Sequence, residues 1–175
     1  MSAFTIFTSL LCLASVPETR GNDAVETAGN VLLYVLPASA AGLALSLKDG
    51  EGAWQLAESG ALTLGVTFGL KYAIHAQRPS GGGHSFPSGH TAASFFPAEF
   101  LRKRYGWEFG LPAYILGSAV AYSRVESREH YLRDVAGGAA IGMLSGYLLT
   151  TPYKGWRVQL EVNGGNRGFK IGRAF

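Results

Sequence analysis

The chain has 175 residues and a mass of 18.6 kDa, which suits a single domain. Hydrophobic residues make up 47% of it and charged residues only 15%, a composition that excludes a disordered chain. The net charge of +3 is too small to indicate a nucleic-acid partner. The few charges lie in short islands that separate apolar runs, and this uneven distribution directs the interpretation below.

The first 16 residues are apolar and have the length of a signal peptide. Ala14 and Val16 are small residues near a potential cleavage site, but no Lys or Arg precedes the stretch. We therefore expect residues 1–16 to be either a signal peptide or a first apolar helix. The single cysteine, Cys12, lies in this segment, so the chain has no internal disulfide and no cysteine-based metal site.

Residues 17–153 read as a helical core. Two charge-free runs, which start at Thr27 and at Val135, have about the length that a membrane-spanning helix needs, and the other runs are shorter. We expect an all-α bundle of five to six helices that is transmembrane, with a buried soluble or peripheral bundle as the alternative. The predicted helices cover about 29–47, 53–77, 89–104, 109–123 and 131–150.

Residues 154–175 form a short basic tail of different composition. Hydrophobic and polar residues alternate from Trp156 to Val162, and Asn163-Gly164-Gly165-Asn166 follows as a turn sequence. This pattern predicts a β-hairpin.

The alternating directions of the helices place the loops at 78–88 and 124–130 on one side of the bundle. The loops at 48–52 and 102–108 and the tail lie on the other side, which carries most of the basic residues. The positive-inside rule makes that second side cytoplasmic and turns the first side outward. The arginines at 78, 124 and 128 break this rule, so they need another explanation.

Lys71 and Arg78 are seven residues apart, which predicts that both lie on one face of the second helix. Two cations on an otherwise apolar face indicate a bound anion, with snorkelling to the membrane interface as the alternative. Ser88 and Gly89 open the next helix, where unpaired backbone N–H groups favour an oxyanion.

His130 and Asp134 have helical i, i+4 spacing, so the carboxylate is expected to orient the imidazole. Arg124 precedes them and offers a guanidinium fork for a phosphate. His90 and His130 give this set of residues two histidines. Two histidines suit phosphoryl transfer, in which one attacks phosphorus and the other protonates the leaving oxygen. Each feature has an ordinary structural alternative, such as helix capping, and together they predict an anion pocket.

Three segments, KYAIHAQRP, PSGH and SRVESREHYLRD, match Lys-x6-Arg-Pro, Pro-Ser-Gly-His and Ser-Arg-x5-His-x3-Asp at every specified position. On these residues the chain resembles the type 2 phosphatidic acid phosphatase superfamily, whose members include lipid phosphatases, acid phosphatases and vanadium haloperoxidases. The resemblance implies that His130 attacks phosphorus, that Asp134 orients His130, and that His90 protonates the leaving group. It also implies that no metal or other cofactor takes part. The phosphate-binding residues that it implies are Lys71, Arg78, Ser88, Gly89 and Arg124.

We therefore expect a metal-independent phosphatase that acts through a phosphohistidine on a lipid phosphate or diphosphate. The expected location is the bacterial inner membrane, with several spans and the active site facing the periplasm. Candidate substrates are phosphatidic acid, phosphatidylglycerol phosphate, undecaprenyl diphosphate and phosphorylated lipid A. A periplasmic broad-range acid phosphatase, released by signal cleavage, is the alternative. A vanadate-dependent haloperoxidase is a more remote one.

Overall fold

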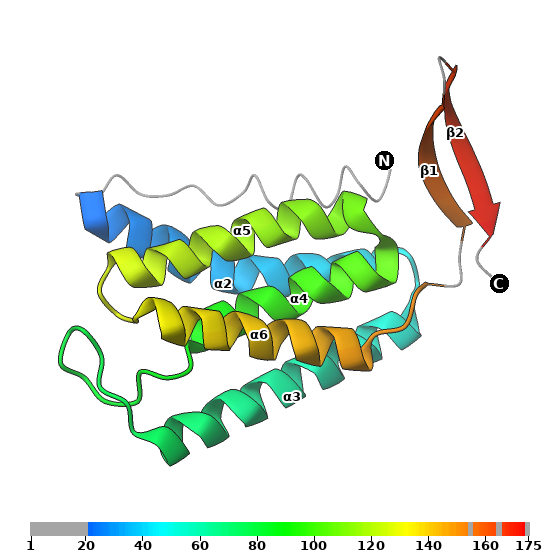
Figure 1. Ribbon diagram of the computed structural model, residues 1–175. Coiled ribbons are helices and arrows are strands. Elements are labelled where there is room, and N and C mark those ends of the chain that lie inside the picture. The colour runs from blue at the N-terminus through cyan, green and yellow to red at the C-terminus, as the bar shows by residue number, and fades with distance from the viewer. Residues whose placement is uncertain (1–20, 154–155, 164–165, 174–175) are drawn as a thin grey trace.

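The computed structural model describes residues 21–153, 156–163 and 166–173 (Figure 1). The predicted signal peptide or first helix at 1–16 lies outside these residues. The part from 21 to 153 contains five helices and no strand, which confirms the all-helical core. The helices are α2 Gly21–Ser46, α3 Gly50–Ile74, α4 Gly89–Tyr105, α5 Trp107–Glu126 and α6 Leu132–Leu149.

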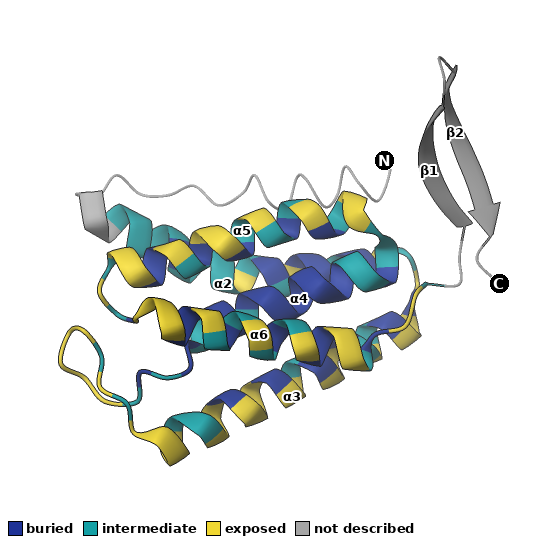
Figure 2. Ribbon diagram, viewed as in Figure 1, coloured by how far each residue is buried: buried dark blue, intermediate teal, exposed yellow. Residues whose placement is uncertain are grey.

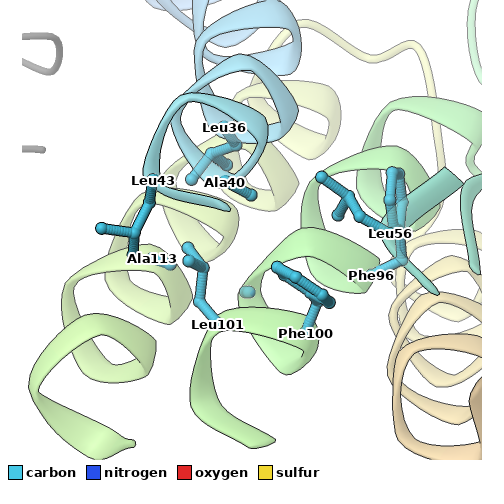
Figure 3. Close-up of a cluster of buried hydrophobic side chains, with 9 residues drawn as sticks. Leu36, Ala40, Leu43, Leu56, Phe96, Phe100, Leu101 and Ala113 are labelled. Atoms are coloured by element: carbon cyan, nitrogen blue, oxygen red, sulfur yellow. The ribbon is translucent and has the colours of Figure 1, made fainter. Parts of the chain in front are cut away.

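Helix α4 runs through the centre of the bundle, and the other four helices surround it (Figure 1). Its residues are buried along most of its length, whereas the surrounding helices each expose one face (Figure 2). Phe100 and Leu101 of α4 are fully buried and lie in a cluster with Leu36 of α2 and Ala113 of α5 (Figure 3). The core therefore forms around α4, and that helix carries the Pro-Ser-Gly-His motif at its start.

Glycines on one face of α6 allow it to lie close against α4. A Cβ atom on Gly138 would lie 2.3 Å from the carbonyl oxygen of Ser88, and one on Gly142 would lie 2.4 Å from that of Ala92. Gly146 continues the row, four residues further on. Since no larger residue fits at these positions, the packing fixes the start of α6 beside the start of α4.

A buried ion pair joins three elements at the end of the bundle that lacks the motif residues. Arg104 of α4 donates to Asp49, the N-cap of α3, from Nε at 2.7 Å and from Nη2 at 2.5 Å. The same guanidinium donates from Nη1 to the carbonyl of Thr151, just after α6. Both charges are paired and hydrogen-bonded, which a buried ion pair requires.

One predicted helix end and the predicted helical placement of His130 are wrong. Helix α3 ends at Ile74, and His75 takes the left-handed conformation with φ 49°, so Arg78 lies in the following loop and shares no helix face with Lys71. Pro79 disfavours helical geometry at the residue before it, so a helix that continues through Arg78 is disfavoured. Helix α6 begins at Leu132, so His130 precedes the helix that carries Asp134.

Of the described helices, α2 contains the one segment that is long and apolar enough to cross a membrane, Ala24–Ser46, with a mean hydropathy of 1.6. The second run that was predicted to span, from Val135, forms α6, which does not meet this criterion. The two loops that carry the motif residues lie at one end of the bundle, and the α2–α3 and α4–α5 turns lie at the other (Figure 1).

After the helices, β1 (Trp156–Asn163) pairs with β2 (Asn166–Arg173) in an antiparallel register. The pairing runs from Trp156 with Arg173 to Asn163 with Asn166. Among the described elements these two strands contact each other and no helix. The helical core therefore builds the site without them.

Candidate active site

A pocket of about 330 Å³ opens at the end of the bundle where the motif residues gather. It is lined by Glu26, Asn30, Arg78, His90, Arg124, Glu129 and His130. Four of these were predicted as site residues, and they come from four separate places along the chain. The fold thus brings the two histidines and two of the three predicted basic side chains to one cavity.

The first turn of α4 carries Gly89 and His90, which line the cavities of the site. Ser88 is the N-cap of this helix, is fully buried and accepts a long hydrogen bond, 3.4 Å, from the backbone N–H of Thr91. Its own backbone N–H donates to the carbonyl of Asp134 at 2.9 Å. The Ser88 hydroxyl therefore caps the helix, the ordinary structural alternative, and its backbone ties α4 to α6. His90 follows in the first turn and reaches the pocket.

His130 is held by the tight turn that follows α5. The carbonyl of Arg124 accepts hydrogen bonds from the backbone N–H groups of both Glu129 and His130, each at 3.1 Å. Arg128 adopts a φ of 57° to make this turn. Burial, together with the positive charges of Lys71 and Arg78, lowers the pKa of His130 to about 4. The imidazole is therefore neutral near pH 7, which is the state that a nucleophile needs.

Asp134 lies behind His130 and is fully buried. Its Oδ2 atom is 3.8 Å from Nδ1 of His130, too far for a hydrogen bond. The same Oδ2 accepts hydrogen bonds from the backbone N–H of Tyr131 at 3.0 Å and from the hydroxyl of Ser85 at 2.5 Å. The pair that the sequence predicted is thus close in space, but no direct hydrogen bond joins its two members.

Arg124 is fixed by residues of α2. Its Nη1 donates to Oδ1 of Asn30 at 3.0 Å, and its Nη2 donates to the carbonyl of Glu26 at 2.9 Å. Gly29 makes this approach possible, because a Cβ atom there would lie 2.8 Å from Nη2 of Arg124. The guanidinium is therefore positioned before any anion arrives.

Lys71 and Gly89 line a second cavity, an apolar groove of about 550 Å³. The ammonium of Lys71 donates to the carbonyl of His84 at 2.7 Å. Arg78, His90 and His130 line both the pocket and the groove, so the two cavities meet at the histidines. The rest of the groove is formed by Leu33, Tyr34, Pro37, Gly60, Leu64, Thr67, Phe68, Ala93 and Phe96.

Arg78 forms an ion pair with Glu129, and both side chains are about one-third exposed. Glu129 lies outside the matched motif positions. The arginine that the motif assigns to the phosphate therefore has a carboxylate partner in this structure.

Sequence reasoning did not find the contributions of Ser85, Asn30 and Glu26. Ser85 stands in the loop just before the Pro-Ser-Gly-His motif, and Asn30 lies in helix α2, outside the three matched segments. Neither has a spacing that points to the site, so only the packing of distant segments reveals them. Among the described residues, no group of three or more His, Cys, Asp or Glu side chains is arranged to hold a metal ion.

The model of the PAP2 superfamily matches residues 80–157. The lipid A 4'-phosphatase of Helicobacter pylori is 32% identical over 181 aligned residues, which cover 93% of this chain and 91% of that protein.

Two solved structures share the fold. LpxE of Aquifex aeolicus has a TM-score of 0.58 and 23% identity, with 83% of this chain and 84% of that chain covered. The transmembrane PAP2-type phosphatidylglycerolphosphate phosphatase of Bacillus subtilis has a TM-score of 0.59 and 21% identity, with 84% and 82% covered. Each likeness thus covers more than four fifths of this chain.

Proposed function

Because the chain belongs to the PAP2 superfamily and is a phosphatase, we propose that it removes phosphate from a membrane lipid by attack of His130 on phosphorus. The observation that carries the proposal is the junction of the two cavities. The polar pocket and the apolar groove share Arg78, His90 and His130. A phosphate headgroup suits the first cavity and an acyl chain suits the second.

The exposed surface of the bundle supports a membrane location. Its outward faces carry large apolar side chains, among them Phe68, Ile115 and Leu144, which are 52%, 61% and 59% exposed. Such a surface is costly in water and favourable in lipid. Exposed aromatic residues, which prefer the membrane interface, lie near both ends of the bundle. They are Tyr72, Tyr122 and Tyr131 at the site end and Trp54, Trp107 and Tyr147 at the other.

The charges support an orientation with the site outside the cytoplasm. Lys48, Arg102 and Lys103 lie at the end opposite the site, where the positive-inside rule predicts the cytoplasm. A direct test uses the exposed positions 128 and 48 in a Cys12→Ser background. In intact spheroplasts, a maleimide that does not cross membranes is expected to label Arg128→Cys and to spare Lys48→Cys. The reverse labelling would contradict this orientation.

The proposed chemistry uses the two histidines that line both cavities. The bond from His130 to phosphorus forms while the ester P–O bond breaks, and His90 gives its proton to the leaving alkoxide. His90 then activates a water molecule, which attacks the phosphohistidine and releases inorganic phosphate. Arg124, Arg78 and Lys71 offset the negative charge of the phosphoryl oxygens in both steps.

Phosphorylated lipid A is the first substrate to test, because the relative that aligns over most of its length is named a lipid A 4'-phosphatase. Phosphatidic acid, phosphatidylglycerol phosphate and undecaprenyl diphosphate complete the lipid panel. p-Nitrophenyl phosphate represents the soluble substrates of a broad-range acid phosphatase.

The test is phosphate release by the purified full chain in detergent, with and without EDTA. We expect release from at least one lipid, resistance to EDTA, inhibition by vanadate and loss of activity in His130→Ala. His75→Ala is the matched control, because His75 is exposed and lines neither cavity. Full activity in His130→Ala or abolition by EDTA would contradict the mechanism. Activity on the soluble ester alone would contradict the lipid substrate.

A further inference from the structure

Ser85 stands between His130 and Asp134. Its side chain is fully buried, and its Oγ atom donates a hydrogen bond to Oδ2 of Asp134 at 2.5 Å. The same Oγ lies 3.4 Å from Nδ1 of His130, a long hydrogen bond. Because Nδ1 and Oδ2 are 3.8 Å apart, the hydroxyl makes the connection that the imidazole and the carboxylate do not make directly.

The number of available protons decides the direction of these hydrogen bonds. A serine hydroxyl has one proton, and an ionised carboxylate only accepts. The hydroxyl proton of Ser85 therefore points to Asp134, which leaves a lone pair of Oγ facing the imidazole. That lone pair can accept a hydrogen bond from an N–H group at Nδ1 of His130. The chain of hydrogen bonds runs from His130 through Ser85 to Asp134.

We infer that Ser85 is a positioning residue that holds His130 in its Nδ1–H tautomer and connects it to the carboxylate of Asp134. This tautomer leaves the lone pair of Nε2 available to attack phosphorus. The inference rests on the proposed role of His130 as the nucleophile. The sequence spacing predicted that Asp134 contacts the imidazole of His130. The inference assigns this contact to Ser85, which lies outside the matched motifs.

The backbone of Ser85 is held independently of its hydroxyl. Its N–H donates to the carbonyl of Ala76 at 2.8 Å, within the same loop. Nearby, the backbone of Ser88 is bound to the carbonyl of Asp134. Ser85→Ala therefore removes one oxygen atom and its two hydrogen bonds while both backbone links remain. The variant tests the relay itself and disturbs the loop little.

The tautomer can be observed without any substrate. The chain has four histidines, so ¹⁵N-histidine spectra of the full chain in detergent micelles are simple to assign with single His→Gln variants. We expect the wild type to show His130 with the proton on Nδ1, and Ser85→Ala to show a mixture of tautomers. A wild-type His130 that carries its proton on Nε2 would overturn the inference, even if Ser85→Ala failed to fold.

Kinetics provide the second test. Loss of one neutral hydrogen bond to the nucleophile is expected to lower kcat about tenfold and to leave KM nearly unchanged. Ser59→Ala is the matched control, because Ser59 is also fully buried and donates to the carbonyl of Gln55, away from the pocket. In an Asp134→Ala background, Ser85→Ala should cost little more, since the relay is already broken.

These outcomes separate the two proposals. An inactive wild type would contradict the proposed function, whereas the tautomer of His130 would still decide the role of Ser85. An active wild type with an equally active Ser85→Ala variant would overturn the role of Ser85 and leave the proposed function standing.

Discussion

The guanidinium of Arg78 and the carboxylate of Glu129 are ion-paired at the polar pocket that His90 and His130 line. The two residues lie 51 positions apart, on the loops that follow α3 and α5. A substrate phosphate that binds Arg78 has to displace this carboxylate or share the guanidinium with it. On the proposed role of Arg78, Glu129 is therefore expected to compete with the substrate phosphate for the guanidinium.

Glu129→Gln is expected to strengthen binding of vanadate, a phosphate mimic, by about twofold to fivefold, because a partly exposed ion pair is worth at most about 1 kcal/mol. Vanadate inhibition constants measure this effect. Glu126→Gln is the matched control, since Glu126 is exposed and accepts a hydrogen bond from Tyr122. Weaker vanadate binding in Glu129→Gln would show that the carboxylate helps to organise the pocket.

Arg124→Lys is expected to lower kcat/KM by about 10²–10³, because the ammonium group cannot reproduce a preorganised guanidinium fork in the transition state. Lysine also cannot keep the two contacts with Asn30 and Glu26 that hold the fork in place. Hydrolysis of the best substrate in the panel measures the effect. Arg128→Lys, on the exposed turn, should retain wild-type activity, and equal losses in both variants would contradict the assignment.

Gly138→Ala is expected to destabilise the protein by about 1–3 kcal/mol, because the added methyl group overlaps the carbonyl of Ser88 and forces α6 away from α4. Thermal unfolding in detergent measures the change. Gly65→Ala is the control, since a Cβ atom there meets no atom within 4 Å and alanine favours the helix. A Gly138→Ala variant as stable as Gly65→Ala would contradict the close packing of the two helices.

The pH dependence follows from the pKa of His130, which burial and the charges of Lys71 and Arg78 lower to about 4, below the ordinary range of a histidine. Attack on phosphorus needs the neutral imidazole. The nucleophile is therefore expected to stay competent as the pH falls from about 7 to about 5, where a histidine with an ordinary pKa is mostly protonated. The check is kcat/KM against pH, corrected for the separately titrated phosphate of the substrate.

Lys71→Met supplies the control for this pH profile. Burial is the larger cause of the lowered pKa of His130, and the positive charge of Lys71 is the next. Removal of that charge should lower the level of activity and move the acid limb to higher pH. An acid limb near pH 6.5 in the wild type would contradict the lowered pKa.

Much of the helical core was predictable from local features of the chain. Apolar runs, charged islands and Gly or Pro breaks predicted all five helices between residues 21 and 153, and α4 was placed to within one residue. The motif spacing predicted which side chains gather, and Arg78, His90, Arg124 and His130 do line one pocket. Helix formation and capping depend on neighbouring residues, so the sequence carries this information directly.

The contacts of the site were decided by the tertiary structure. Spacing placed Arg78 on the face of α3 and set His130 directly against Asp134, whereas the early end of α3 frees Arg78 to meet Glu129 and the turn before α6 leaves room for Ser85. Asn30 reaches Arg124 beside Gly29, where α2 and α5 lie close together. Such contacts join segments far apart in the chain, and their distances depend on how closely helices pack, which local sequence patterns do not encode.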